Sequence, residues 1–324
     1  MRALVLGGHA GPASLELREI PAPQAGAGEV RVRVRAVGIN RADLLQCLGR
    51  YPGPSMAYEV PGLEFSGVVE SLGPGAPENL LEAPVCGILA GGAYAEYVVT
   101  AARLLLPVPD GFSFEQAAAI PEAFLTAHDA LHNRGAMQRG ETVLVHAAAS
   151  GVGIAALQLA RLAGARVLAT LRSASKVARL RQWLSEDPLV LSEARFADAV
   201  RERTGGRGAD LVLDFVGAAY LEENLRALAP RGRLVVIGLL GGTGATLDLG
   251  RLLTQRLRIE GTVLRSRPLA EKIALTEQFR SVLPHFQSGS LAPVIDTVFP
   301  FEQAAQALEL MAANRNTGKL ILTA

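Results

Sequence analysis

The sequence from Thr142 to Lys176, TVLVHAAASGVGIAALQLARLAGARVLATLRSASK, contains the clearest structural signal in the chain. It opens with a short apolar, β-branched run, Thr142–Val145, and continues through a turn of small residues, Ala147–Gly153. A helical pattern follows over Ile154–Ala163, and a second apolar run, Val167–Leu171, closes the segment. This order predicts one β-α-β unit with a tight turn between the first strand and the helix.

The small-residue turn is typical of a dinucleotide-binding site. In a Gly-x-Gly-x-x-Gly template, Ala148 and Ser150 occupy the first two glycine positions and Gly153 occupies the third. Side chains this small let the backbone approach a pyrophosphate, which the N–H groups at the start of a helix stabilise. The alternative is a turn that only packs the helix against the strand, and the further cofactor signals below favour the binding site.

More apolar runs continue the alternation along the chain. Leu211–Val216, Leu234–Gly238 and Leu257–Leu264 predict strands, and Leu221–Leu228 predicts a helix between two of them. Repeated βα units whose strands are apolar throughout predict a parallel, doubly wound Rossmann sheet with helices on both faces. The predicted fold class is therefore α/β, with this sheet as one of its parts.

The sequence before this region has a different pattern. Val30–Val37 alternates apolar residues with arginine, as a strand with one solvated face does, and Leu63–Leu72 and Ala93–Val99 are further strand-like pieces. Glycine and proline are frequent between them, for example from Tyr51 to Pro61. Residues 1–120 therefore predict a mainly β domain with antiparallel or barrel-like strands and few helices.

A chain of 324 residues exceeds the usual size of one core, so two domains are expected. After the last Rossmann strand, Phe301–Met311 predicts a helix and Lys319–Leu322 a strand, and neither continues the α/β alternation. We therefore predict a cofactor-binding domain over 121–264 and a catalytic domain formed by 1–120 and 265–324. The active site is expected in the cleft between them.

Composition narrows the environment and the partners. The net charge of +1 gives no electrostatic reason to expect nucleic acid or an anionic membrane as a partner. No apolar stretch is long enough to span a bilayer, and Met1–Gly7 predicts a first strand rather than a signal peptide. The two cysteines, Cys47 and Cys86, cannot form a disulfide framework, so we expect a cytoplasmic protein.

Several motifs, in the order in which they occur, resemble the zinc-free quinone oxidoreductases of the medium-chain dehydrogenase/reductase superfamily: Asn40–Leu44, Gly62–Glu64, Ala118–Pro121, Leu125–Ala127 and His146–Gly153. Other stretches resemble the p53-inducible quinone oxidoreductase branch in particular: Arg41–Gln46, Ala117–Ala127, Leu264–Arg267 and Leu283–Phe286. The resemblance implies a GroES-like catalytic domain and homodimers joined edge to edge through the Rossmann sheets. Glu82–Val85 departs from the Gly-Asp-x-Val turn that is usual in the family.

The resemblance also bears on metal binding. Zinc alcohol dehydrogenases of the superfamily hold a catalytic zinc through a thiolate, an imidazole and a further ligand. In this sequence Asn40 fills the first ligand position and Leu63 the histidine position, whereas Glu64 is kept. Two cysteines and five scattered histidines rebuild neither this catalytic site nor the four-cysteine structural zinc site of those enzymes, and His146 is expected to be packed. We therefore predict no metal, and reduction of an electrophilic acceptor rather than oxidation of an alcohol.

The end of the second Rossmann strand indicates which nicotinamide cofactor is bound. A site for NAD usually has Asp or Glu there, bonded to the ribose 2′-hydroxyl, but Ala169–Lys176 contains no acid. Arg172, Ser173 and Lys176 instead supply charge and donors for a 2′-phosphate, and we include the neighbouring Thr170 in the site. The alternative is that the two basic residues are surface charges at the start of a helix. NADPH is the predicted cofactor.

Further cofactor positions are implied by the resemblance. Thr126 would bond near the nicotinamide ribose, and the Leu264 region would meet the carboxamide. Lys319, in the terminal Gly-Lys motif of the family, would approach the cofactor from the other domain, unless it is only a lysine at the edge of the last strand. The full predicted cofactor set is Thr126, Ala148, Ser150, Gly151, Val152, Gly153, Thr170, Arg172, Ser173, Lys176, Gly238, Leu239, Leu264 and Lys319.

The predicted catalytic residues are Asn40, Tyr51 and Ser150. Asn40 would donate a hydrogen bond to a quinone oxygen, Tyr51 would donate a proton or form a wall of the pocket, and Asp43 would be structural. The predicted function is NADPH-dependent reduction of a quinone by hydride transfer. The alternatives are a reductase of enones or enoyl thioesters, and an NADPH-binding regulatory or RNA-binding protein with little turnover, of which the RNA-binding form is disfavoured by the neutral charge.

Overall fold

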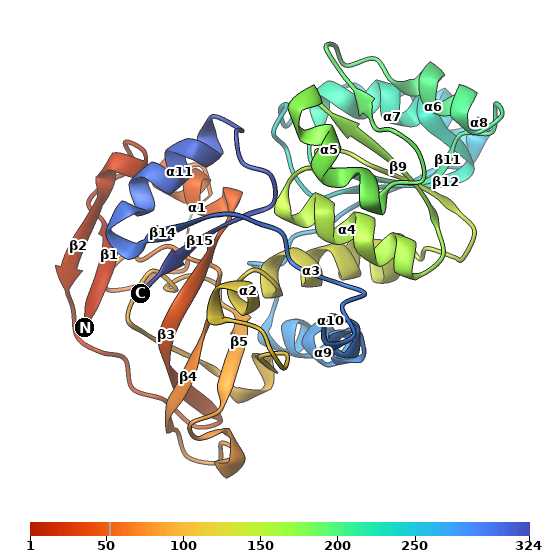
Figure 1. Cartoon of the computed structure of the whole chain (residues 1–324). Coiled ribbons are helices and arrows are strands. Elements are labelled where there is room, and N and C mark those ends of the chain that lie inside the picture. The colour runs from red at the N-terminus through yellow and green to blue at the C-terminus, as the bar shows by residue number, and fades with distance from the viewer. Residues whose placement is uncertain (52) are drawn as a thin grey trace. The chain divides into compact units, whose positions relative to one another are not determined.

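The computed structural model describes residues 1–51 and 53–324, so Pro52, in the predicted Tyr51–Pro61 loop, lies outside it. The chain forms two compact units (Figure 1). The first unit comprises Met1–Leu125 and Leu264–Ala324, and the second comprises Thr126–Val263. The sequence predicted these boundaries at 120/121 and 264/265.

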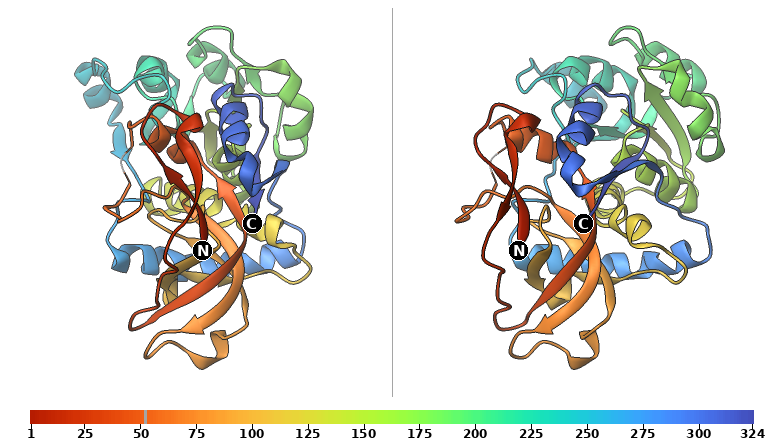
Figure 2. Two further views of the ribbon diagram at one scale, coloured as in Figure 1. Left: turned by 90° about the vertical axis from the view of Figure 1, so that its left-hand side faces the viewer. Right: turned by 60° about the vertical axis from the view of Figure 1, so that its left-hand side comes forward.

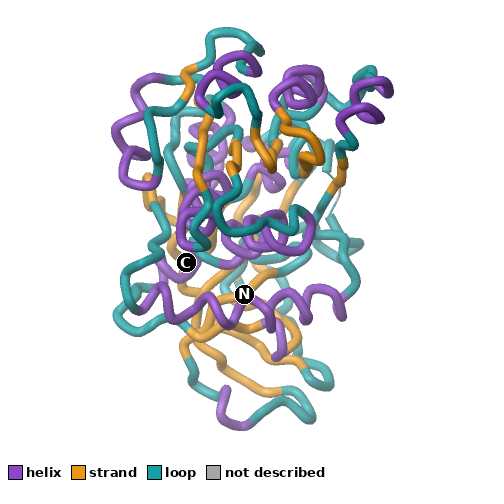
Figure 3. The backbone as a smooth tube through the Cα atoms, turned by 90° about the vertical axis from the view of Figure 1, so that its right-hand side faces the viewer, coloured by secondary structure: helices purple, strands orange, loops and turns teal. Residues whose placement is uncertain are grey.

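The second unit is built around one parallel sheet of six strands, in the order β10-β9-β8-β11-β12-β13. The strands are β8 (Thr142–Val145), β9 (Arg166–Leu171), β10 (Leu189–Val190), β11 (Ala209–Asp214), β12 (Leu228–Val236) and β13 (Arg258–Gly261). The helices are α4 (Gly151–Leu162), α5 (Val177–Leu180), α6 (Ala197–Arg203), α7 (Leu221–Ala227) and α8 (Leu249–Gln255). The tube in Figure 3 shows these strands in orange and the helices in purple.

The strand order places the small-residue turn at a functional position. From β8 the chain builds the sheet outward through β9 and β10, then returns to the other side of β8 and adds β11, β12 and β13. In open α/β sheets, ligands bind at the carboxyl ends of the strands where the order reverses. Strand β8 is that switch point, and it is buried along its whole length. The predicted Rossmann sheet is therefore confirmed. The turn Ala147–Gly153 follows β8 directly, so it lies at the switch point.

The first unit contains a seven-stranded sheet in the order β14-β15-β3-β4-β5-β7, with β6 also paired to β3. Its strands are β3 (Glu29–Ile39), β4 (Glu64–Leu72), β5 (Pro84–Ile88), β6 (Tyr97–Ala101), β7 (Leu105–Pro107), β14 (Ile295–Pro300) and β15 (Lys319–Thr323). All pairs are antiparallel except β14 with β15. A separate antiparallel pair, β1 (Arg2–Leu6) and β2 (Leu15–Glu19), stands beside it (Figure 2). This architecture confirms the mainly β domain that the sequence predicted.

The helices that begin in this unit are α1 (Arg41–Cys47), α2 (Phe114–Ala118), α3 (Pro121–His128), α9 (Leu269–Phe279), α10 (Leu283–Gln287) and α11 (Ala304–Ala312). Helix α3 runs on into a π-helical turn, Asp129–Arg134. The predicted C-terminal helix is found, with its first residues in a 3₁₀ turn, Phe301–Gln303. No helix in residues 1–51 or 53–324 is long and apolar enough to cross a membrane.

Candidate functional site

The start of α4 has the geometry of an anion site. Ser150 is the N-cap of this helix, and its Oγ accepts a hydrogen bond from the backbone N–H of Gly153 at 3.0 Å. That bond satisfies one of the donors that a helix start leaves open. The N–H groups of Gly151 and Val152 have no acceptor within the helix at these positions. Their direction along the axis of a 12-residue helix suits a phosphate.

Close packing explains the third position of the template. A Cβ atom on Gly153 would lie 2.6 Å from the carbonyl oxygen of Ala147 and 2.8 Å from Cα of Ala148. Only glycine fits there, as expected for the residue that brings the helix against the strand. Ala147 itself has φ of 44°, in the left-handed region that a side chain disfavours. The turn thus holds strained backbone at the switch point of the sheet, a place where strain often has a functional reason.

The end of β9 carries the basic residues that were predicted to bind a 2′-phosphate. Since β9 pairs in parallel with β8, its carboxyl end lies next to the start of α4. The side chain of Arg172 is exposed, and Ser173 and Lys176 are partly buried. The Ser173 hydroxyl lies 2.7 Å from that of Ser175. The segment therefore presents positive charge and hydroxyl groups, and no carboxylate, at the edge of the site.

Thr170 faces the interior rather than this edge. It is 1% exposed, and its hydroxyl lies 2.8 Å from Nδ1 of His146. On the other side of the ring, Nε2 of His146 lies 2.6 Å from Oδ1 of Asn224. Asn224 in turn donates through Nδ2 to Oδ2 of Asp214 at 3.0 Å. The hydroxyl of Thr170 thus supports the strand end from within, and its direct contact with a cofactor stays a prediction.

The hydrogen bonds of this chain assign the tautomer of His146. Because Asn224 donates to Asp214, its carbonyl oxygen faces the ring, so Nε2 of His146 carries the hydrogen and Nδ1 accepts from Thr170. Burial lowers the pKa of His146 to about 4, which keeps the ring neutral. His146 is packed, as the sequence predicted. Burial also raises the pKa of Asp214 to about 6, although the backbone N–H groups of Val216 and Gly217 oppose the shift.

The remaining cofactor positions have mixed environments. Gly238 follows β12, and a Cβ atom there would lie 2.9 Å from the carbonyl oxygen of Phe215, so the strand ends approach closely. Leu239 is 51% exposed, whereas Leu264 is buried and Thr126 partly buried. Thr126, Gly238 and Leu239 belong to the second unit, and Leu264 to the first.

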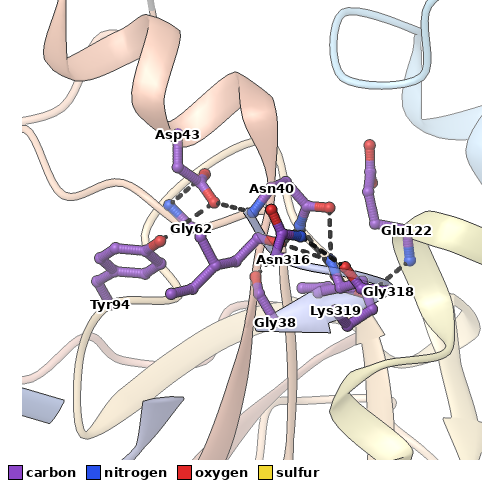
Figure 4. Close-up of polar contacts among 11 residues, drawn as sticks. Gly38, Asn40, Asp43, Gly62, Tyr94, Glu122, Asn316, Gly318 and Lys319 are labelled. Carbon is purple, nitrogen blue, oxygen red and sulfur yellow. Dashed lines mark hydrogen bonds and ion pairs between the residues drawn. The ribbon is translucent and has the colours of Figure 1, made fainter. Parts of the chain in front are cut away.

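The first unit holds a buried network of charged groups around Lys319 (Figure 4). The ammonium group of Lys319 donates to Oε1 of Glu64 at 2.5 Å, to Oδ1 of Asn40 at 2.7 Å and to the carbonyl oxygen of Ile39 at 2.8 Å. The side chains of Lys319 and Glu64 are 5% and 0% exposed. All three ammonium hydrogens are therefore used inside the unit, and contact of Lys319 with a cofactor would require this network to rearrange.

Asn40 is equally engaged. Its amide nitrogen donates to the carbonyl oxygen of Gly38 at 3.2 Å and to Oε1 of Glu64 at 2.9 Å. An amide has two N–H donors, so both are taken. The predicted donation from Asn40 to a quinone oxygen would require one of these bonds to break. The structure thus brings two predicted site residues, Asn40 and Lys319, into direct contact with each other.

Asp43 has the structural role that the sequence predicted for it. Its carboxylate accepts hydrogen bonds from the backbone N–H of Asn40 at 2.8 Å, from that of Gly62 at 3.2 Å and from the hydroxyl of Tyr94 at 3.2 Å. These bonds join the start of α1 to the loop before β4. Burial raises the pKa of Asp43 to about 6, and the bond from Asn40 is the largest influence against that shift.

The side chain of Arg265 holds Tyr51 in place. The guanidinium of Arg265 lies 5.1 Å from the centre of the Tyr51 ring and donates to the Tyr51 carbonyl oxygen at 3.3 Å. The same group bonds to the carbonyl oxygen of Ala90 and to Oε1 of Gln46, at 2.7 and 2.5 Å. Burial raises the pKa of Tyr51, so its phenol is protonated at neutral pH. Arg265 thus fixes both the ring and the backbone of Tyr51.

The described residues, all except Pro52, contain no group of three or more His, Cys, Asp or Glu side chains arranged to hold a metal ion. Glu64, the carboxylate kept from the zinc-binding pattern, is paired with Lys319 instead. Cys47 and Cys86 are buried, and burial raises the pKa of both thiols, so neither is a ready thiolate ligand.

Comparison with known proteins matches both parts of the chain to family models. Residues 26–110 match the alcohol dehydrogenase GroES-like domain, and residues 151–287 match the zinc-binding dehydrogenase model. Quinone oxidoreductase-like protein 2 of Bos taurus is 33% identical, over 91% of this chain and 85% of its own length. Erythronolide synthase EryA2 of Saccharopolyspora erythraea is 40% identical over 92% of this chain, but the chain spans only 8% of that protein.

Solved structures match over the whole chain. A mycobacterial protein complexed with NADPH has 31% identity and a TM-score of 0.91, and an NAD-dependent alcohol dehydrogenase has 33% identity and a TM-score of 0.90, both with 100% of each chain covered. The apo form of the JamJ enoyl reductase has 26% identity and a TM-score of 0.89, with 99% of this chain and 98% of its own covered.

Proposed function

The chain belongs to the medium-chain dehydrogenase/reductase superfamily of oxidoreductases, and on this premise we propose that it is an NADPH-dependent quinone reductase. When bound, NADPH supplies a hydride from C4 of its nicotinamide to the acceptor. The observation that carries the proposal lies at two neighbouring strand ends. After β8, a helix begins so close to the strand that only glycine fits at position 153, and after β9 the chain has basic residues and no acid.

The residues at these strand ends fit the cofactor. The backbone at Gly153 leaves no room for a side chain, and the N–H groups of Gly151 and Val152 are placed to bind a pyrophosphate. Arg172 and Lys176 supply the charge that a 2′-phosphate requires. Ser150 orders the helix start through its cap, and Thr126 and Leu264 are proposed contacts for the nicotinamide ribose and carboxamide.

The first unit supports metal-free chemistry at the acceptor. Lys319 neutralises Glu64 and holds Asn40, so the side chains at the former ligand positions form a rigid, internally bonded frame. Tyr51, fixed by Arg265, has a protonated phenol that can bind a carbonyl oxygen of the acceptor. We propose that a conjugated carbonyl compound is the acceptor, because it accepts hydride without a Lewis acid.

Reduction of an enone or enoyl thioester is the second candidate function. Its support is the similarity to the JamJ enoyl reductase over nearly the whole chain, together with 40% identity to a segment of erythronolide synthase EryA2. The two reactions share the same hydride donor and differ in the acceptor. The third possibility, an NADPH-binding protein with little turnover, differs from both in its lack of any acceptor.

Paired titrations with NADPH and NADH test the cofactor assignment. We expect the protein to prefer NADPH, and the double variant Arg172→Ala/Lys176→Ala to lose about 10- to 100-fold in NADPH affinity with little change for NADH, since charge-assisted bonds to the phosphate are removed. Arg195→Ala, an exposed arginine of the same unit, is the matched control. An NADH preference in the unchanged protein, or equal losses for both cofactors, would contradict the assignment.

Turnover then separates the functions. With NADPH bound, we expect a small ortho-quinone to be reduced faster than an enoyl thioester. The reverse order would establish the second candidate, and tight NADPH binding with no turnover of either acceptor would establish the binder. The predicted homodimer stays a prediction; β13, an edge strand of its sheet with Ile259 37% exposed, is the strand through which a second copy would pair.

A further inference from the structure

Asn224, in helix α7 of the second unit, connects two neighbouring strand ends of the sheet through its side-chain amide. The residue is 0% exposed, so the amide has to be satisfied from within the unit. Its Nδ2 donates to Oδ2 of Asp214, the last residue of β11, at 3.0 Å. Its Oδ1 lies 2.6 Å from Nε2 of His146, the residue that follows β8. One buried amide therefore joins the carboxyl ends of β8 and β11.

Asp214 fixes the turn that follows β11. Oδ1 of its carboxylate accepts a hydrogen bond from the backbone N–H of Val216 at 2.7 Å, and both of its oxygens accept from that of Gly217, at 3.1 and 3.2 Å. Gly217 has φ of 79°, a conformation that residues with a side chain rarely adopt, so this turn has one well-defined shape. Because Asn224 bonds the same carboxylate from α7, it determines where the acceptor for these two N–H groups stands.

The turn after β12 is built on the turn after β11. The backbone N–H of Gly238 donates to the carbonyl oxygen of Asp214 at 3.2 Å, and that of Gly241 donates to the carbonyl oxygen of Val216 at 2.7 Å. Leu239 stands between these two bonded glycines in the sequence. The backbone of Gly238 and Leu239, two predicted cofactor positions, therefore depends on the turn that Asp214 fixes.

On its other side, the amide of Asn224 holds the strand end that leads into the small-residue turn. Nδ1 of His146 accepts from the hydroxyl of Thr170 in β9 at 2.8 Å, and its backbone N–H donates to the carbonyl oxygen of Leu213 in β11 at 3.1 Å. The N–H of Ala148, in the turn itself, donates to the carbonyl oxygen of Thr170 at 3.3 Å. Asn224 is thus the junction of hydrogen bonds that reach the ends of β9, β8, β11 and β12.

We propose that Asn224 is a positioning residue for the nicotinamide cofactor. It sets the turns after β11 and β12 through Asp214, and the turn after β8 through His146, while its own burial keeps it out of reach of a ligand. The inference rests on the proposed function, because it requires a dinucleotide to bind at these strand ends. Since the 2′-phosphate is assigned to Arg172 and Lys176 after β9, Asn224 acts on the part of the cofactor that NADPH and NADH share.

Asn224→Ala tests the inference, and Leu225→Ala is its matched control. Leu225 is the next residue of α7, is 2% exposed and belongs to the apolar core of the unit, so its truncation also destabilises the fold but leaves the amide network intact. We expect Asn224→Ala to weaken the binding of NADPH and NADH by the same factor, roughly 10-fold in fluorescence titrations. Leu225→Ala should keep both dissociation constants within about 2-fold. Unchanged affinities in Asn224→Ala, or equal losses in Leu225→Ala, would overturn the inference.

Amide hydrogen exchange of the folded protein without cofactor tests the route through Asp214. The amide of Val212, in the middle of β11, reports opening of the whole sheet, whereas those of Val216 and Gly217 report the turn. Relative to Val212, we expect the two turn amides to exchange faster in Asn224→Ala and to keep their protection in Leu225→Ala. Weakened cofactor binding without faster exchange in the turn would contradict the positioning role.

The outcomes separate this inference from the proposed function. No binding of either cofactor by the unchanged protein would overturn both. Binding by the unchanged protein that Asn224→Ala leaves intact would overturn the inference alone, and so would a loss confined to NADPH, because the residue would then serve the phosphate. Asn224→Ser, a smaller truncation, gives the same comparison if the alanine variant does not fold, with a loss expected for both cofactors.

Discussion

Each of the two units contains a buried polar network, and the two networks use different chemistry. In the first unit, Lys319 and Glu64 form a buried ion pair, and Asn40 is bonded to both. In the second, the neutral groups of Thr170, His146 and Asn224 form a chain that ends at the carboxylate of Asp214. Removing Lys319 or Glu64 leaves an uncompensated buried charge in the first network, whereas removing Thr170 or His146 leaves only unpaired neutral groups in the second.

The two networks also join different parts of the sequence. The bond between Lys319 and Glu64 spans 255 residues and joins the last strand, β15, to β4. Asn40, at the start of α1, is bonded to both side chains. The bonds of His146 span 24 and 78 residues and connect neighbouring strand ends beside the nucleotide turn. We infer that the charged network chiefly secures the fold of its unit, whereas the neutral network chiefly sets the shape of a binding site.

The largest expected effect follows from breaking the ion pair. Lys319→Met should lower the free energy of unfolding by about 3–5 kcal/mol, because Glu64 is then buried without a counter-charge. Urea unfolding followed by circular dichroism measures this loss. In the double variant Lys319→Met/Glu64→Gln, part of the stability should return, since no charge is left unpaired.

The matched control is an exposed pair in the same unit. Arg103 and Glu277 form an ion pair with both side chains about half exposed or more, and Arg103→Ala should cost less than about 1 kcal/mol. A comparably small loss in Lys319→Met would show that the buried pair does not dominate its unit, and the contrast between the two networks would fail.

The second prediction concerns pH and the neutral network. The pKa of His146 is about 4 in the folded protein against 6.5 for an ordinary histidine, so the unfolded chain binds a proton more readily. Its contribution to stability is therefore complete above about pH 6.5 and is lost as the pH falls toward 4. Between pH 6.5 and 5 the loss is on the order of 2 kcal/mol.

Replacing His146 by glutamine isolates this contribution. Asp43 and Asp214 have folded pKa values of about 6, above the ordinary value of 3.8, so their effect on stability is opposite to that of His146: it rises as the pH falls from 6.5 to 5. Both aspartates are still present in the variant. We expect His146→Gln to be less stable at pH 7 but to lose less stability than the unchanged protein between pH 6.5 and 5. Parallel pH profiles of the unfolding free energy would show that the ring does not titrate.

Local patterns in the sequence predicted five of the six strands of the second unit, all except β10. Strand β8 coincides with the predicted Thr142–Val145, because a fully buried strand between turn residues leaves a continuous apolar run. Strand β14 was missed, since none of its residues is fully buried and it ends in Pro300. Helix α9 was missed too; its buried face includes Lys272, so the apolar periodicity is weak. Partial burial removes the signal from which elements are predicted.

The candidate site was less predictable than the fold. The motifs around Asn40 and Glu64 pointed to a former metal position, but only the tertiary structure brings Lys319 to it across 255 residues. The bonds of Arg265 to Ala90, Tyr51 and Gln46 span 175 to 219 residues, so no local pattern in the sequence displays them. Glu82 stands where the family usually has the glycine of a Gly-Asp-x-Val turn. Its φ of 62° shows that the backbone keeps the left-handed conformation that glycine favours, although the residue has a side chain.

The smallest effect tests where the neutral network ends and the cofactor site begins. Thr170→Val keeps the side-chain shape and removes the hydrogen bond to Nδ1 of His146, so we expect a loss of about 1 kcal/mol in unfolding free energy. If Thr170 acts only from within, the NADPH dissociation constant should change less than that of Ser173→Ala, at the exposed end of the same strand. A larger loss of NADPH affinity in Thr170→Val would mean that the hydroxyl serves the cofactor directly. The neutral network would then be part of the binding site, and its difference from the charged network would lie in function as well as in chemistry.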